Sequence, residues 1–214
     1  MRFLGTLGLG LLLSAPAMAE APTYNWSGFY AGANLGTASE TQLSNVVVNG
    51  VPVNLNPAQT GNGLLAGGTI GWNWHPLGSI FVAGVEGDFD WSGISMVQTA
   101  GCSSPCHHSI QWLATARVRV GKAVGDTLFY ATGGAAFASI HGDSGVFYNT
   151  TETRTGWTAG AGIEKPLAPH WTVKLEYLYA SFGAGSCVPL APLTCALNQS
   201  AHVQMMRGGL NYWF

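Results

Sequence analysis

The sequence predicts an all-β protein: an eight-stranded antiparallel up-and-down transmembrane β-barrel preceded by a cleavable signal peptide. First, side-chain type alternates with a period of two along most of the chain, as in strands with one apolar face. Second, 47% of the 214 residues are apolar and only 8% are charged, against roughly 25% charged in a soluble domain. Third, beyond the N-terminus no run of about 18 apolar residues exists, which excludes membrane-spanning helices.

The N-terminus has the features of a secretory signal peptide. A positively charged start precedes an apolar core at 3–13, and Ala17-Met18-Ala19 forms a small-residue cleavage site. We therefore expect a signal peptide over 1–19 and a single outer-membrane barrel domain over 20–214. A chain exported in this way folds in an oxidising space beyond the inner membrane.

The first four predicted strands cover 29–37, 64–74, 80–91 and 110–121. Their apolar, outward faces comprise Phe29, Ala31, Ala33 and Leu35, then Ala66, Ile70, Trp72 and Trp74, then Phe81, Ala83, Val85, Phe89 and Trp91, then Trp112, Ala114, Ala116, Val118 and Val120. Their inward faces comprise Tyr30 and Asn34, then Thr69 and Asn73, then Glu86, Asp88 and Asp90, then Gln111, Thr115, Arg117 and Arg119. An apolar exterior around a polar interior is typical of outer-membrane strands.

The last four predicted strands repeat this pattern. The fifth covers 128–140, the sixth and seventh lie in 155–182 on either side of a break at 165–170, and the eighth covers 202–214. The outward face of the 155–182 hairpin comprises Trp157, Ala159, Ala161 and Ile163, then Trp171, Val173, Leu175, Tyr177 and Tyr179. Aromatic residues at both margins of an apolar band mark strands that cross a bilayer.

The predicted connections alternate between long and short. Long loops are expected at 38–62, 92–109, 142–153 and 183–200, the first with a small excursion at 46–53. Short turns separate the remaining strands. Outer-membrane barrels have short periplasmic turns and long outer loops, so both termini should be periplasmic and the long loops extracellular.

Nine of the charged residues are expected to point into the barrel. They are Glu86, Asp88, Asp90, Arg117, Arg119, Glu164, Lys174, Glu176 and Arg207. Counting along the strands places Glu86 beside Arg117 and Glu176 beside Arg207, in one layer at mid-height. We expect these pairs to plug a lumen that is already filled by side chains. The alternative is a gated path for ions or small solutes.

The four cysteines are expected to form two disulfides. Three connectivities are possible, and the spacing favours Cys102 with Cys106 and Cys187 with Cys195. His107 and His108 follow the first pair, which resembles a zinc-binding cluster in residue types. In an exported loop, a disulfide-closed tip with exposed histidines is the preferred interpretation, and no metal is expected.

Ser139 and His141 share the outward face near the outer rim, where some eight-stranded barrels carry lipid-modifying catalytic groups. No motif fixes their geometry, so no catalytic residue and no cofactor is expected, and the protein is not expected to be an enzyme. His202, near a loop junction, is interpreted as an interfacial residue.

Five segments carry a family resemblance: 25–36 (NWSGFYAGANLG), 85–93 (VEGDFDWSG), 128–134 (LFYATGG), 156–164 (GWTAGAGIE) and 171–179 (WTVKLEYLY). With them, the chain resembles the small outer-membrane barrel proteins of alphaproteobacteria, known as porin-family or outer-membrane immunogenic proteins, and more distantly the membrane domain of OmpA. The resemblance implies a structural, surface-exposed and antigenic role without catalytic residues. Some members bind ligands through their loops.

The expected function is therefore that of an integral outer-membrane protein with a structural, antigenic role. The alternatives are a small-solute or ion channel, loop-mediated ligand or adhesin binding, and a lipid-modifying barrel enzyme. A soluble lipocalin-like barrel is the alternative fold.

The expected partners are outer-membrane lipid, lipopolysaccharide and the outer-membrane assembly machinery. That machinery would recognise the alternating C-terminal residues Leu210, Tyr212 and Phe214. A surface ligand stays possible, a monomer is expected, and a net charge of -2 gives no argument for nucleic acid.

Overall fold

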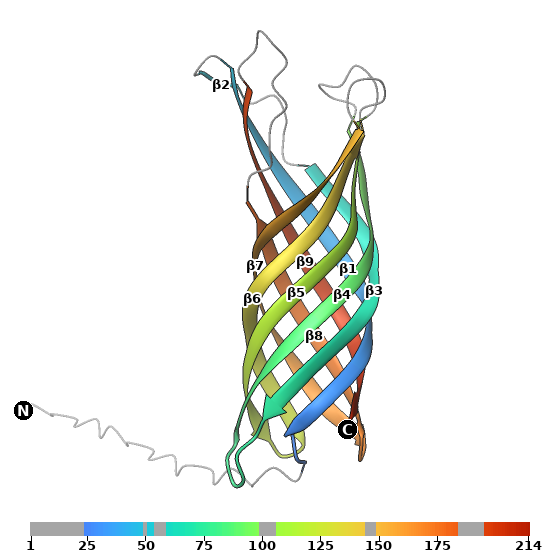
Figure 1. Ribbon diagram of the computed structural model, residues 1–214, viewed down its shortest axis with the longest axis vertical. Coiled ribbons are helices and arrows are strands. Elements are labelled where there is room, and N and C mark those ends of the chain that lie inside the picture. Colours follow the sequence, from blue (N-terminus) through green and yellow to red (C-terminus); the bar gives the residue numbers. More distant parts are fainter. Residues whose placement is uncertain (1–23, 49–50, 54–58, 99–105, 144–148, 184–194) are drawn as a thin grey trace, which may run out of the picture.

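The computed structural model describes residues 24–48, 51–53, 59–98, 106–143, 149–183 and 195–214 (Figure 1). The predicted signal peptide at 1–19 lies outside these residues. Within the described ranges, no helix is long and apolar enough to cross a membrane.

The described residues form nine strands. They are β1 (Gly28–Val48), β2 (Val51–Val53), β3 (Gln59–Trp74), β4 (Phe81–Gln98), β5 (Cys106–Val124), β6 (Thr127–Asp143), β7 (Asn149–Ala168), β8 (Trp171–Phe182) and β9 (Cys195–Trp213).

The sheet is a closed up-and-down barrel. Each long strand pairs antiparallel with the next long strand in the sequence, and β9 pairs with β1 to close the circle. The short β2 pairs only with the upper end of β1, so eight of the described strands form the wall. The strands are steeply tilted around the barrel axis (Figure 1). This confirms the predicted eight-stranded antiparallel barrel.

The two ends of the barrel differ in their connections. Residues 75–80, 125–126 and 169–170 form short links at the lower end, where the C-terminus also lies (Figure 1). The backbone nitrogen of Phe214 donates to the carbonyl of Phe29 there, at 3.1 Å. The strand ends that border the longer connections lie at the upper end. The alternation expected from the sequence is therefore present.

The strands extend further at the upper end than the sequence predicts. The expected loop at 38–62 instead contains the continuation of β1 to Val48, the hairpin with β2 and the start of β3 at Gln59. Likewise, β4 continues to Gln98 and β5 begins at Cys106. The predicted loops at 142–153 and 183–200 are shortened in the same way by β6, β7 and β9.

The reason for this error is a reversal of the hydrophobic phase, which occurs on every wall strand except β7 among the described residues. In the lower barrel the apolar residues face outward, whereas in the upper barrel apolar residues such as Ala201 and Val203 on β9 face inward. Their outward neighbours there are polar, as His202 and Gln204 illustrate. A search for one continuous apolar face therefore ends each strand where the phase changes.

The length of the strands agrees with a barrel of two zones, an apolar band and a polar-surfaced part above it. A strand of about 18 residues rises about 45 Å along the barrel axis, at about 3.3 Å per residue and a tilt of about 40°. The apolar band of an outer-membrane barrel is only about 25 Å tall. The upper, polar-surfaced part therefore projects beyond the band.

A register shift on β5 corrects one predicted orientation. The pairing of β5 with β6 shifts between Ile110 and Trp112, and that with β4 shifts at the same level. As a result Ile110 points into the barrel, whereas Gln111, which we expected to face inward, is exposed. An extra residue in one strand has this effect because it interrupts the alternation of faces.

Candidate functional site

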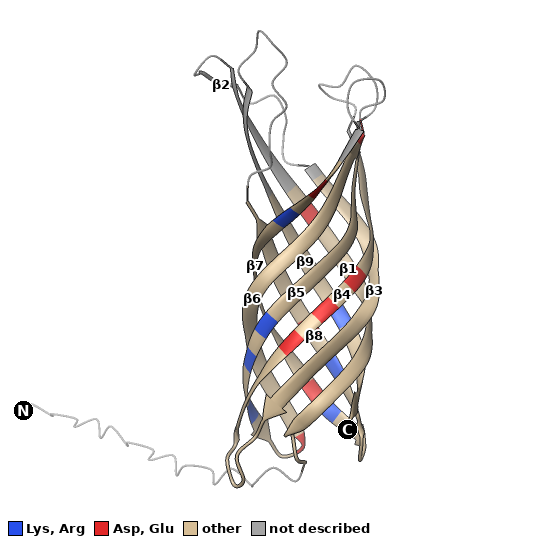
Figure 2. Cartoon of the chain, in the orientation of Figure 1, with Lys and Arg blue, Asp and Glu red and all other residues tan. Residues whose placement is uncertain are grey.

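The lower half of the lumen contains a network of charged side chains. It includes all nine residues selected from the sequence, and each of them is at most 5% exposed. They come from five strands: Glu86, Asp88 and Asp90 on β4, Arg117 and Arg119 on β5, Glu164 on β7, Lys174 and Glu176 on β8, and Arg207 on β9. Figure 2 shows acidic and basic positions on strands around the barrel at this height.

Arg117 lies at the centre of the network. Its guanidinium donates to Glu86, to Asp88 at 2.6 Å and to Glu176 at 3.0 Å. The first contact follows from register, because Glu86 and Arg117 are direct cross-strand partners. The other contacts cross the lumen or reach along the strand. One cation thus contacts three buried carboxylates.

Arg207 has a similar role on the opposite strand. It donates to Asp88 at 3.0 Å, to Asp90 at 2.5 Å and to Glu176 at 2.7 Å. Glu176 is its direct partner across β8 and β9. Asp88 and Glu176 therefore each bind both arginines, and the two expected pairs belong to a single layer.

The lower part of the network is organised around Arg119. This side chain donates to Glu164 at 2.7 Å and to the hydroxyl of Tyr30 at 2.8 Å. Its guanidinium carbon also lies 3.9 Å from the centre of the Tyr130 ring, within the range of a cation–π contact. Lys174 donates to Glu86 at 3.0 Å and so connects the two levels.

Neutral polar residues add hydrogen bonds to the network, and the sequence reasoning did not select them. The hydroxyl of Tyr30 donates to Glu86 at 2.7 Å, and that of Tyr130 donates to Glu176 at 3.1 Å. Thr69 and Thr115 donate to the two oxygens of Asp88, each at 2.7 Å. The signal in the sequence that could have identified these residues is their position on the polar, inward face of the strands.

The network has the properties of a structural core. It contains five acids and four bases, so its formal charge is nearly balanced. A buried ion is tolerated when it is both paired and hydrogen-bonded, whereas loss of one partner leaves an uncompensated charge. Each of the five carboxylates contacts at least one cation. The arrangement holds each of these charged groups in contact with a group of opposite charge.

An aromatic layer closes the lumen below the charges. It comprises Trp26, Tyr30, Val82, Ala123, Leu128, Tyr130 and Trp213. The ring centres of Trp26 and Trp213 are 5.8 Å apart, and those of Tyr30 and Trp213 are 4.7 Å apart. Trp26 precedes β1, so the chain ahead of the first strand is folded into the lower mouth.

An apolar layer closes the lumen above the charges. It comprises Ala38, Leu65, Ile94, Ile110, Leu113, Ala136, Ala138, Ile140, Leu178, Ala180, Phe182, Ala201, Val203 and Met205. Its upper members, such as Ala201 and Val203, come from the projecting part of the strands. The upper barrel thus has the ordinary arrangement of a water-soluble protein, with an apolar interior and a polar surface.

A second polar group lies near the upper mouth. Glu40 on β1 is fully buried, and one of its carboxylate oxygens lies 3.2 Å from Nε2 of His108 on β5. Arg154 on β7 lies 3.8 Å from Glu152 on the same strand. Sequence reasoning missed Glu40 because it placed that residue in a loop.

The residues considered for catalysis are not brought together. The hydroxyl of Ser139 contacts the side-chain oxygen of Gln111 at 3.4 Å, and Nδ1 of His141 contacts the hydroxyl of Thr151 at 2.9 Å. No hydrogen bond in the described part of the chain joins Ser139 to His141. Nδ1 of His202 contacts the hydroxyl of Tyr179 at 2.8 Å on the outer surface.

Cys102 and Cys187 lie outside the described residues, and for Cys106 and Cys195 only the backbone is described. The C-terminal residues are described, and Leu210, Tyr212 and Phe214 all face outward. The rings of Tyr212 and Phe214 pack edge to face, with centres 5.2 Å apart.

Comparison with known proteins gives consistent matches. A family model described as "Outer membrane protein beta-barrel domain" matches residues 6–214. The 31 kDa outer-membrane immunogenic protein of Brucella melitensis is 32% identical, covering 94% of this chain and 89% of that protein. The 25 kDa outer-membrane immunogenic protein of Brucella abortus is 30% identical, covering 93% and 84%.

Among solved structures, the crystal structure of Neisserial surface protein A superposes with a TM-score of 0.52. The alignment covers 88% of this chain and 98% of that one, at 13% sequence identity. At this level of identity the similarity concerns the fold alone.

Proposed function

The chain belongs to the family described as the outer membrane protein beta-barrel domain, and we propose that it works as a closed anchor that holds its outer connections at the cell surface. It is an integral protein of the outer membrane. Its Brucella relatives are named immunogenic proteins, and a surface-exposed, antigenic role in the envelope accounts for an architecture that ends in long connections.

The observation that supports an anchor over a channel is the filling of the lumen at three successive levels. The aromatic layer, the charge network and the apolar layer follow one another along the axis. A diffusion channel needs a continuous aqueous path, and eight-stranded barrels leave room only for their own side chains. The function then lies in the outer connections and the outer wall, without catalysis.

Conductance of the purified barrel in planar bilayers tests this proposal. We expect no large, steady conductance, because opening a path would require at least three layers to rearrange together. A steady open state in most insertions would overturn the anchor and favour passage of ions or small solutes.

The proposed orientation places the C-terminus and the short turns in the periplasm, and the long connections outside. An epitope inserted within residues 144–148 should bind antibody on intact cells. The same epitope inserted after Gly125 should bind only after the outer membrane is permeabilised. The reverse result would show that the barrel has the opposite orientation in the membrane.

A further inference from the structure

The residues at 24–27, here called the strap, precede β1 and make contacts that the anchoring role does not explain. On one side they are fixed to the connection between β3 and β4. The hydroxyl of Ser27 donates to the carbonyl of His75 at 3.0 Å and accepts from the backbone nitrogen of His75 at 2.9 Å. The backbone nitrogen of Trp26 donates to Nδ1 of His75 at 3.3 Å. The start of the strap on β1 is therefore tied to the end of the neighbouring strand β3.

The other side of the strap reaches in the opposite direction around the barrel. The ring of Trp26, which is fully buried, lies 5.8 Å from the ring of Trp213 on β9. The ring of Tyr24 lies 4.8 Å from that of Trp26, and its hydroxyl donates to the carbonyl of Pro169 at 3.3 Å. Pro169 belongs to the connection between β7 and β8. The strap thus extends from the β3–β4 connection to the β7–β8 connection.

The local sequence directs the chain from β1 into the lower mouth. The side-chain oxygen of Asn25 accepts a hydrogen bond from the backbone nitrogen of Ser27 at 3.0 Å, which is the arrangement of an Asx turn. Gly28 follows with a φ of +132°, a conformation that glycine adopts readily and other residues rarely do. These residues begin the segment 25–36 that carries the family resemblance, and the structure gives them a role in placing the strap.

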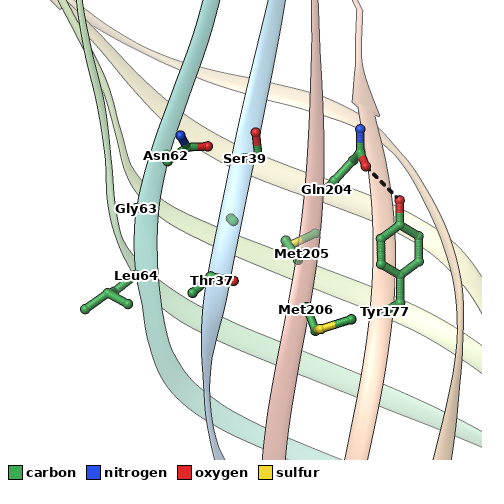
Figure 3. Close-up of a pocket in the computed structure, with 10 residues that line it drawn as sticks. Thr37, Ser39, Asn62, Gly63, Leu64, Tyr177, Gln204, Met205 and Met206 are labelled. Carbon is green, nitrogen blue, oxygen red and sulfur yellow. Dashed lines mark hydrogen bonds between the residues drawn. The ribbon is translucent and has the colours of Figure 1, made fainter.

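The pairing of β1 with β9 is the closing seam of the barrel, because it joins the first strand of the wall to the last. Figure 3 shows part of its outer side, where Thr37 and Ser39 of β1 lie beside Met206 and Gln204 of β9. The hydrogen bond drawn there, 3.1 Å long, joins Tyr177 of β8 to Gln204 and does not cross the seam. Among the described residues, no side-chain hydrogen bond or ion pair joins β1 to β9. The seam therefore depends on its backbone pairing and on packing, to which the strap adds contacts at the lower end.

The two sides of the strap differ in when they can form. β1 and β3 are neighbours along the chain, so the bonds between Ser27 and His75 can form with that hairpin. The contacts with Trp213 and Pro169 need β9 and β8 in place beside β1. Contacts between residues far apart in the sequence carry a larger loop-closure cost and form late. One side of the strap can thus be in position before the seam closes, and the other side can bind only afterwards.

We propose that the strap is a lock that engages once β9 has paired with β1 and that slows the reopening of the barrel. Interactions that form after the transition state for folding slow unfolding and leave the folding rate unchanged. The lock therefore concerns how long a closed barrel persists. It is independent of the orientation of the barrel and of what its outer connections present.

Folding and unfolding rates of the whole chain in phosphatidylcholine vesicles test the lock. Folding starts on dilution from urea and unfolding on transfer into urea, and gel mobility reports the folded fraction. Trp26→Ala should unfold at least about ten-fold faster, because a large buried side chain is lost, and should fold within about two-fold of the parent rate. Ser27→Ala, which removes both bonds to His75, should unfold about five-fold faster or more, again with little change in folding.

Two further variants serve as controls. Leu77→Ala changes a fully exposed residue in the same β3–β4 connection, and both of its rates should stay within about two-fold of the parent. Trp26→Phe keeps an aromatic ring and removes the indole nitrogen, which has no hydrogen-bond partner among the described residues. It should unfold more slowly than Trp26→Ala.

The lock requires faster unfolding with an unchanged folding rate in both Trp26→Ala and Ser27→Ala. Slower folding in these variants would place the strap in the folding nucleus and overturn the proposal. Unchanged unfolding, or equal acceleration in Leu77→Ala, would overturn it as well. Because these are rates of the purified barrel, neither result affects the conductance and surface-labelling tests of the anchor.

Discussion

Adjacent glycines on β6 differ in what a side chain would meet. A Cβ at Gly134 would lie 2.7 Å from the Cα of Arg117 and closer still to the carbonyl oxygen of Ala116. At Gly133, which faces outward, the nearest atom is the carbonyl oxygen of Thr158 at 3.5 Å. Glycine is thus required inside, where strands approach a crowded lumen, and is dispensable outside.

Gly134→Ala should therefore destabilise the barrel, and Gly133→Ala should leave it nearly unchanged. The first change forces the backbone of β5 to move, which typically costs about 1–3 kcal/mol in a packed interior. Urea unfolding of both variants in the same lipid measures the difference. Equal free energies of unfolding would contradict the assignment of the two faces.

Arg117→Met tests the charge network at a single residue. The change leaves three buried carboxylates short of a cation, and breaking a buried pair in this way costs about 3–5 kcal/mol. Lys122→Met, at an exposed position on the same strand, serves as the control. The midpoint of urea unfolding should fall for the first variant and change little for the second. A similar small effect of both would mean that the network adds little to stability.

At the scale of single elements, the phase reversal determines where the outer face of a strand tolerates a charged substitution. On β4, Val85 lies in the lower, apolar part of the outer wall and Ser95 in the upper, polar part, and both are exposed. The two positions are on the same face of the same strand. They differ in depth relative to the apolar band.

Val85→Arg should cost up to about 2–4 kcal/mol, because a basic residue at mid-depth must be taken into the hydrocarbon. Ser95→Arg should cost close to nothing, because its side chain stays in water. Reversible folding into bilayers measures both free energies. If Ser95→Arg were as costly as Val85→Arg, the apolar band would extend to the upper end of β4.

The phase reversal also explains which parts of the fold could be predicted from the sequence. Strand number, order, pairing and the nine inward charges follow from alternation in the apolar band, where one face is always apolar. The upper halves of the strands could not be predicted in this way. There, apolar residues such as Ala38 and Val203 face inward, whereas the apolar residues of the lower band face outward. The register shift at Gln111 also has no signal in the alternation. The contacts across the lumen depend on barrel closure, so Tyr30 and Tyr130 could be placed on a face but not given partners.

At the scale of the whole molecule, the barrel is a stack of four environments. From the lower end they are aromatic, ionic, apolar and, around Glu40 and His108, polar again. Each of the first three layers fills the lumen with side chains from several strands. Closure therefore does not depend on any one of them.

Loss of a single layer should leave the barrel closed. Leu178→Ser weakens the apolar layer and Glu176→Gln weakens the ionic layer, but in each case the other layers remain. Neither variant should show steady conductance in planar bilayers. If one of them conducts like an open pore, that layer alone is the gate and the seals are not redundant.

The uncharged polar residues on the outer surface of the described upper barrel, among them Ser39, Asn62, Thr153 and Gln204, also bear on how the protein reaches its final position. A chain that arrives from the periplasm must carry this part through the hydrocarbon before it can reach the far side. Moving a hydroxyl or an amide out of water costs about 0.5–2 kcal/mol on a scale where partial hydrogen bonding is allowed, whereas a basic side chain at the midplane costs about 2–4 kcal/mol. Serine, threonine, asparagine and glutamine at these positions therefore lower the kinetic barrier to insertion. The uncharged polar side chains that let this surface contact water therefore also let it cross the hydrocarbon during insertion.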